Sequence, residues 1–158
     1  MLQPYFEWME NLPLSNTIRD SVYIYSVDQA LHLVFLSVFA GAVLIVDLRL
    51  LGRGFSQQPV AQVAQDAQPW MMWGFLGLFL TGIPQLFGTA MKQYYSPMFW
   101  LKIDFLIVAI IYTLTIRRKV AMADETRVGP LWGKVVGFVS IVLWAGVAIP
   151  ARLIGLIS

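Results

Sequence analysis

The stretch QALHLVFLSVFAGAVLIVDLRLL, residues Gln29–Leu51, decides the fold of this chain. A helix needs about 20 mostly apolar residues to cross the hydrocarbon core of a bilayer, and this run is long enough. Similar runs follow at residues 70–88, 98–116 and 131–157. The sequence therefore predicts an all-α fold, a transmembrane four-helix bundle.

The composition agrees with a membrane protein. Hydrophobic residues make up 58% of the chain and charged residues 13%, whereas about a quarter of the residues of a soluble domain are charged. Helices of a soluble core would also need polar faces, which these four runs lack. The loops between the runs are too short to hold an enzyme domain, so any chemistry is expected within the bundle or at its faces.

The residue content argues against a nucleic-acid partner and excludes sites that are built from cysteine. The net charge is +2, and the basic residues lie at the ends of the predicted helices, so we expect no nucleic-acid partner. The chain has no cysteine, which excludes disulfides, thiolate metal sites, iron–sulfur clusters and covalently attached c-type haem.

The N-terminal segment, residues 1–28, is predicted to be separate from the transmembrane domain over residues 29–158. Residues 4–12 (PYFEWMENL) mix aromatic side chains with two glutamates, a pattern that suits an amphipathic helix lying along the outer membrane surface. Ser15 or Asn16 is then the expected N-cap of a second short helix.

Lysine and arginine set the expected orientation, because they gather at the cytoplasmic side of membrane proteins. If the first helix runs from outside to inside, the residues at the cytoplasmic face are Arg49, Arg53, Arg117, Arg118, Lys119, Arg127 and Lys134. The residues at the outer face are then Arg19, Lys92, Lys102 and Arg152. We therefore predict that both termini lie on the outer, non-cytoplasmic side.

Ionisable residues within membrane spans are rare and usually face the bundle interior or water. Here they form two layers. The inner layer is Asp47 and Arg49 near the end of the first helix. These residues are two apart and do not share a helix face, so we expect them to have different partners. An orientation anchor and an interhelical hydrogen bond are the expected roles, with a transport pathway as an alternative.

The outer layer is the more site-like group, because alternating topology brings three helices to one depth there. Its members are His32, Lys102, Asp104 and Arg152. Each of them also suits an interfacial position, satisfied by water or phosphate. We treat the group as a candidate cofactor site, while the catalytic residues, if there are any, are unknown.

His32 is the one histidine in the chain, and imidazole is the commonest haem-iron ligand in a site without cysteine. A single histidine is more often a hydrogen-bonded structural residue. As a ligand, it would be the metal-binding residue of a haem b, whose propionates or second axial position would be met by Lys102 or Arg152. A bis-histidine haem within one chain is excluded by the histidine count.

The run Leu31–Gly52 resembles a bacterial family of small four-helix membrane proteins of unknown function. Matching features are Ile18-Arg19-Asp20, Leu31-His32, Asp47–Gly52, Thr81-Gly82, Ser96–Lys102, Leu143-Trp144 and Ala151-Arg152. The resemblance spans nearly the whole chain. It implies the topology, shared polar positions and a bacterial inner membrane as the location, but no activity.

A second resemblance is to the HemJ-like protoporphyrinogen oxidases, which are also small four-helix membrane proteins. The matching residues are His32, Phe39-Ala40-Gly41, Arg49 and Trp100-Leu101-Lys102. This similarity implies that His32 is a haem ligand and that Lys102 is a pocket residue.

Three hypotheses about function follow. The first is a haem b protein of electron transfer or porphyrin redox chemistry, with its site near the outer face. The second is a non-catalytic accessory subunit that self-associates or packs against a larger membrane complex. The third is a small transporter or channel. Whether the protein is an enzyme is left open by the sequence.

Overall fold

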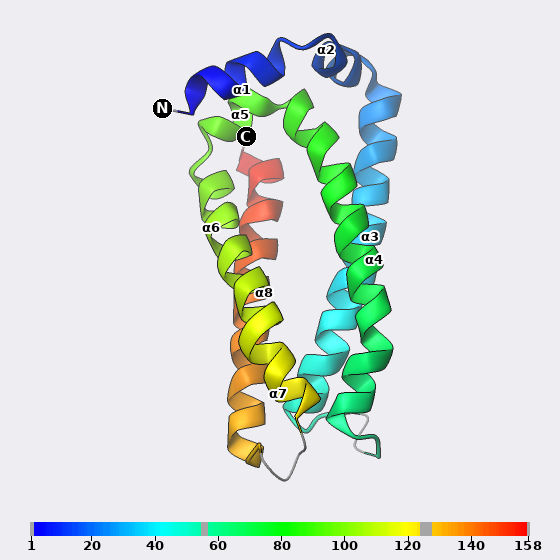
Figure 1. The fold of residues 1–158 in the computed structure, drawn as a ribbon. Helices are drawn as coiled ribbons and strands as arrows, with labels where there is room; N and C mark the ends of the chain where they lie inside the picture. The colour runs from blue at the N-terminus through cyan, green and yellow to red at the C-terminus, as the bar shows by residue number, and fades with distance from the viewer. Residues whose placement is uncertain (1, 55–56, 124–127, 158) are drawn as a thin grey trace.

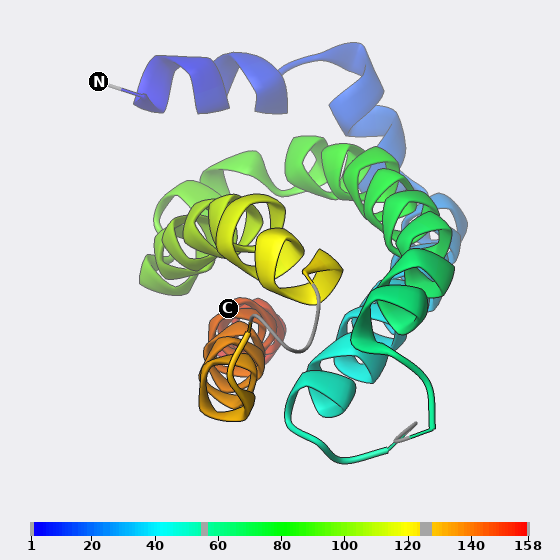
Figure 2. The ribbon, with the colours of Figure 1, turned by 60° about the horizontal axis from the view of Figure 1, so that its bottom comes forward.

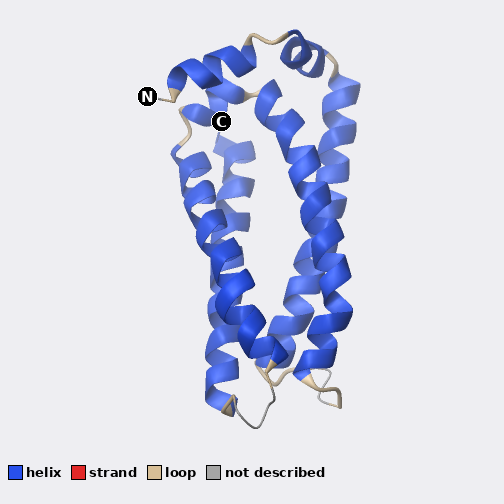
Figure 3. Cartoon of the chain, in the orientation of Figure 1, coloured by secondary structure: helices blue, strands red, loops and turns tan. Residues whose placement is uncertain are grey.

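The computed structural model describes residues 2–54, 57–123 and 128–157, which form helices and no strand. Figure 1 shows a bundle, and Figure 3 shows its helical content. Four helical stretches are long and apolar enough to cross a membrane. They are α3 (Val22–Leu50), α4 (Val60–Gly88), α8 (Pro130–Ile157), and α6 (Pro97–Tyr112) extended by the π-helix η1 (Thr113–Arg117) and by α7 (Arg118–Met122). The predicted all-α four-helix bundle is confirmed.

Two of these helices, α3 and α4, begin before the apolar runs that predicted them, which start at residues 29 and 70. Helix α3 starts at Val22 because the Ser21 side chain accepts a hydrogen bond from the Ile24 backbone N–H and caps the first turn. Helix α4 starts at Val60, after Pro59. Hydropathy finds the part of a helix that suits lipid, and these helices continue beyond it.

The N-terminal segment forms two short helices, α1 (Gln3–Glu10) and α2 (Pro13–Asp20), across one end of the bundle (Figure 1). We call this the terminal end, since α8 also finishes there, and the opposite end the loop end. The predicted cap of the second helix was wrong, because α2 starts at Pro13, the favoured first residue of a helix. Ser15 lies inside α2, buried, and its hydroxyl donates to the Met9 carbonyl.

An aromatic cluster holds α1 to the bundle. Phe6 of α1 is buried against Phe99 and Trp100 of α6 and Tyr94 of α5 (Ala90–Tyr94). The Glu10 carboxylate accepts a hydrogen bond from the Met91 backbone N–H at 2.9 Å. Together these contacts dock the N-terminal segment over the terminal end.

The long helices are arranged as two pairs, α3 with α4 and α6 with α8, and α3 also packs against α8. Figures 1 and 2 show the pairs on opposite sides of the bundle, diverging toward the terminal end. Large apolar side chains cover the outside of the helices, among them Leu33, Phe79, Val108 and Phe138. Such a surface requires lipid around it, and the protein is a multi-pass membrane protein.

Candidate functional site

His32 sits on α3 and is held by a side chain of α4. Its Nδ1 lies 2.7 Å from the Thr81 hydroxyl oxygen, which is buried between the two helices. Gly82 adds space next to the ring, since a Cβ there would be 3.7 Å from His32 Cε1. The pairing of α3 with α4 therefore fixes the orientation of the imidazole.

The tautomer of His32 follows from this hydrogen bond. The Thr81 hydroxyl lies 2.7 Å from the Gly77 carbonyl oxygen. A carbonyl cannot donate, so the one hydroxyl proton goes to Gly77. The hydroxyl must then accept from an Nδ1–H of His32. In the neutral ring this leaves the lone pair on Nε2, which makes no hydrogen bond to any described residue.

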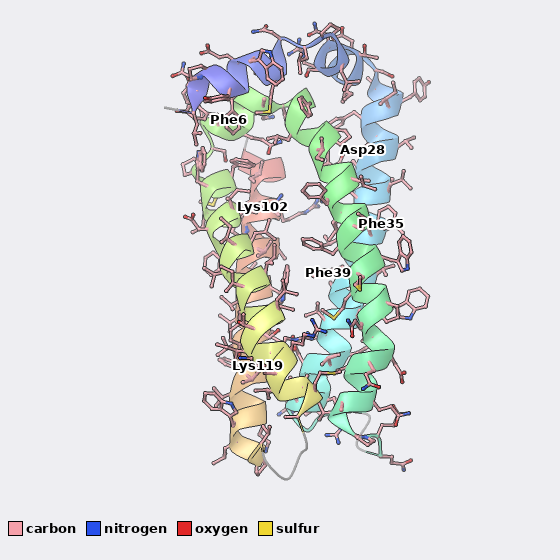
Figure 4. The ribbon with its side chains drawn as sticks, in the orientation of Figure 1. Phe6, Asp28, Phe35, Phe39, Lys102 and Lys119 are labelled. Atoms are coloured by element: carbon pink, nitrogen blue, oxygen red, sulfur yellow. The ribbon has the colours of Figure 1, made fainter. Side chains whose placement is uncertain are left out.

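Other polar groups with unused hydrogen-bonding capacity lie at this level of the bundle. Lys102 and Asp28 both act electrostatically on His32, so they lie in its neighbourhood. Lys102 is partly buried and forms no hydrogen bond or ion pair with the described residues. Asp28 Oδ2 and Gln85 Nε2 are buried and have no hydrogen-bond partner in the described part of the chain. Figure 4 shows Asp28 on α3 and Lys102 on α6, on the two sides of the interior.

The other two members of the predicted outer layer are placed differently. Asp104 and Arg152 are exposed, and neither forms a hydrogen bond or ion pair within the described part of the chain. Asp104 is two residues from Lys102, and residues two apart on a helix point in different directions. The structure therefore places Lys102 within electrostatic reach of His32 and leaves Asp104 and Arg152 at the surface.

A second polar cluster lies nearer the loop end, around Asp47. The carboxylate is fully buried, and Oδ1 accepts from Arg117 Nε at 2.7 Å. Oδ2 accepts from the Ser140 hydroxyl at 2.7 Å. Arg117 Nη2 donates to the Val43 carbonyl at 2.9 Å. This cluster ties α3, η1 and α8 together at the end where the two helix pairs meet.

Arg49 has a different partner from Asp47, as the two-residue spacing predicted. Its Nε donates to the Gln58 carbonyl at 2.7 Å, which ties the end of α3 to the connection before α4. The interhelical role expected for Asp47 is also present, with the bond to Ser140 on α8 and the ion pair with Arg117.

Several residues of both clusters were not predicted as site residues. Asp28 could have been found, because it lies four residues before His32 and so on the same helix face. Thr81 was part of the first resemblance, as Thr81-Gly82, but was not assigned to a site. Gln85 and Ser140 carry no such signal, since polar residues of this kind are common in membrane helices. Arg117 was assigned to the basic cytoplasmic run, and only the fold shows that it turns inward.

Among the described residues, no group of three or more His, Asp or Glu side chains could hold a metal ion. The prediction of a metal ligand therefore rests on His32 alone.

Residues 5–157 match the model of a protein family described as a family of unknown function, DUF6644. The chain belongs to this family. The match covers nearly the whole chain, so both polar clusters and the N-terminal helices lie within the region that defines the family. No curated protein and no solved structure matches the chain. The second resemblance, to the HemJ-like oxidases, is not shown by these comparisons.

Proposed function

We propose that this protein binds a haem b within the terminal half of the bundle, where His32 Nε2 would hold the iron. The observation that carries the proposal is the bond from His32 Nδ1–H to Thr81, whose own proton goes to Gly77. Metal-ligating histidines usually donate their second ring N–H in this way, which fixes the tautomer and the ring orientation.

The surroundings of His32 suit a tetrapyrrole with carboxylate side chains. Lys102 supplies from α6 an ammonium group that pairs with none of the described residues and would meet a propionate. Gln85 supplies an amide N–H that likewise has no partner among them. A protein-bound haem b would supply one-electron redox chemistry, and the polypeptide would contribute the ligand, its orientation and the charge that balances the propionates.

The structure favours this function over a transport pathway through the Asp47 and His32 layers. Both carboxylate oxygens of Asp47 are occupied, and the side chain has no exposed surface. A group that is fully paired in this way is suited to holding helices together. His32 and Lys102 retain free coordination and hydrogen-bonding capacity.

An absorption spectrum tests the proposal. The protein is produced in cells supplied with haem, purified in mild detergent, and titrated with haemin. We expect a Soret band in the unmodified protein and its loss in His32→Ala. Thr81→Val keeps the ligand but removes its orienting partner, so we expect haem affinity to fall by about tenfold or more.

Thr115→Val is the matched control for the threonine substitution. The Thr115 hydroxyl donates to the Ile111 carbonyl of its own helix on an exposed face, far from His32 in the sequence. Its haem affinity should equal that of the unmodified protein. A colourless preparation that also fails to bind added haemin contradicts the proposal, as does an unchanged spectrum in His32→Ala. A stoichiometric protein partner in the colourless preparation would point instead to an accessory subunit.

The location that we propose is the bacterial inner membrane, with the terminal end outside. It is supported by the basic residues at the loop end, including the exposed Arg53, Arg118, Lys119 and Lys134. Positive charge of this kind is retained on the cytoplasmic side. The haem would then lie in the outer half of the bilayer.

Because the chain has no cysteine, single introduced cysteines can report this orientation. Glu7→Cys on α1 and Gln57→Cys after α3 both lie at exposed positions. In intact spheroplasts, a membrane-impermeant maleimide should label Glu7→Cys and leave Gln57→Cys unlabelled until the membrane is broken. The opposite labelling pattern would show the reversed topology.

A further inference from the structure

A cavity of about 370 Å³ lies between α4 and the α6–η1–α7 stretch, in the half of the bundle nearer the loop end. Small-molecule sites in proteins begin at about this size. Its walls are largely apolar and include Phe39, Met71, Phe75, Ile110, Leu114 and Trp144. It is separate from His32 and Lys102, neither of which lines it.

The wall contributed by η1 carries two hydrogen-bond donors that the protein does not fully use. The Thr113 hydroxyl accepts from Trp144 Nε1 at 3.2 Å, but its own proton goes to no described residue. Arg117 Nη1 has the Met71 sulfur at 3.8 Å as its partner, and a thioether is a weak acceptor. Both side chains line the cavity, so a ligand there meets donors and needs an acceptor.

The π-helical backbone at η1 is a second, independent sign of a site. Five residues, Thr113–Arg117, adopt this rare conformation in the middle of an otherwise α-helical stretch. Single π-turns inside α-helices occur frequently at functional sites. Here the π-turn begins and ends with the two residues that carry the unused donors.

Aromatic rings form one side of the cavity. The Phe39 ring meets Trp144 edge to face at a centroid distance of 4.7 Å, and Phe75 lies 5.9 Å from Phe39. Figure 4 labels Phe39 on α3. Aromatic surfaces of this kind pack well against a flat ring, by stacking or by edge contacts.

The buried part of the cavity selects against an anionic ligand. Arg118 also lines the cavity, but it is exposed and its charge can extend toward the membrane interface. Arg117 is the buried cation of the wall, and the Asp47 carboxylate already neutralises it at 2.7 Å. A second anion beside this pair would leave an uncompensated buried charge, which is costly. An uncharged molecule with an acceptor oxygen fits the donors without that cost.

The cavity is reached from the lipid. Met72 and Leu114 line it and are 65% and 62% exposed on helices that span the membrane. A ligand that dissolves in the bilayer can therefore enter between α4 and α6 without crossing water.

We propose that this cavity binds the ring of an isoprenoid quinone, with a ring carbonyl accepting from Thr113 and Arg117 and the tail leaving between α4 and α6. A quinone ring is flat, uncharged and lipid-soluble, and it carries acceptor oxygens. Each property matches one feature of the cavity. The aromatic wall suits a flat ring, and the neutralised Arg117 suits an uncharged one. The lipid-side opening admits a lipid-soluble molecule, and the unused donors need acceptor oxygens.

Quenching of tryptophan fluorescence by decylubiquinone tests this site in purified full-length protein in nanodiscs. We expect saturable quenching, with a component that Trp144→Phe lacks. Thr113→Val removes one donor and should raise the Kd about tenfold, the effect of one net hydrogen bond. Ala64→Leu fills part of the cavity from α4 and should remove saturable binding.

Thr115→Val is again the matched control, since this threonine is two residues away and does not line the cavity. It should bind decylubiquinone with unchanged Kd. Oleate, an anionic amphiphile with a tail and no ring, should not displace the quinone. Absence of saturable quenching, an unchanged Kd in Thr113→Val, or displacement by oleate at equal concentration would each overturn the proposal. The thermal stability of each variant is measured alongside, so that loss of binding is scored on folded protein.

Discussion

Asp47→Ala should lower the free energy of unfolding by about 3–5 kcal/mol, the cost of leaving one member of a buried ion pair without its partner. Arg117 is 4% exposed and would keep its charge among apolar side chains. The Ser140 hydroxyl would lose its acceptor as well. Both losses occur where α3, η1 and α8 meet, so the two helix pairs should separate more easily at the loop end.

The measurement is reversible unfolding in mixed detergent micelles, followed by circular dichroism. Asp66→Ala is the matched control, because Asp66 is an exposed aspartate on α4. It should change stability by no more than about 0.5 kcal/mol. Ser140→Ala should fall between the two, at about 1.5–3 kcal/mol for one hydrogen bond to a charged group.

A double substitution separates loss of the charge pair from loss of packing. Asp47→Leu with Arg117→Met replaces both charges with apolar side chains and should be more stable than Asp47→Ala, since apolar replacements of whole buried pairs are often neutral or stabilising. If Asp47→Ala unfolds like Asp66→Ala, the cluster does not stabilise the bundle and our account of it is wrong.

Gly74→Ala should destabilise the α3–α4 pair by about 1–3 kcal/mol, the usual cost of overpacking. A Cβ at Gly74 would lie 2.9 Å from the Cα, Cβ and backbone N of Phe39. Backbone atoms of a long helix cannot rotate away as a side chain can. The two helices would have to move apart, and the contact between His32 and Thr81 on the same pair would loosen with them.

Gly41→Ala is the control. It makes the same substitution, but we expect it to raise the stability of the protein and not to lower it. Nothing lies within 4 Å of a Cβ at Gly41, so the substitution only improves helix propensity, by about 0.5–1 kcal/mol. The same unfolding assay compares the two variants. Equal effects of Gly74→Ala and Gly41→Ala would contradict the close approach of α3 and α4.

On α6 and its extension, one prediction is confirmed and another is wrong for a single residue. Its apolar residues predicted a span, and its following basic run, Arg117-Arg118-Lys119, predicted a solvated cytoplasmic anchor. The span is present. Arg118 and Lys119 are exposed as expected, but Arg117 is buried in an ion pair with a residue 70 positions earlier. No local pattern could distinguish Arg117 from its neighbours.

Trp144 is an aromatic residue whose place in the bundle, like that of Arg117, only the fold shows. Tryptophans of membrane proteins usually belong to the interfacial belt. Trp144 lies near the middle of the predicted span over residues 131–157, but no local pattern predicts its partners. In the structure it lies inside, against Phe39 and bonded to Thr113, where it lines the cavity. The quinone proposal depends on this residue and was therefore beyond sequence analysis.

The amino-acid sequence by itself determined that four helices cross the membrane, because the cost of burying backbone and charged groups in lipid depends on local composition. It also placed His32, Asp47 and Lys102 within the spans, but not Arg117. The tertiary structure decided their partners: His32 is bonded to Thr81, and Asp47 is bonded to Arg117 and Ser140. These pairings depend on the rotation of each helix about its axis and on the close approach of α3 to α4 at Gly74 and Gly77. At Gly77 the Phe35 ring fills the space that a side chain would take. They arise from packing between residues far apart in the chain.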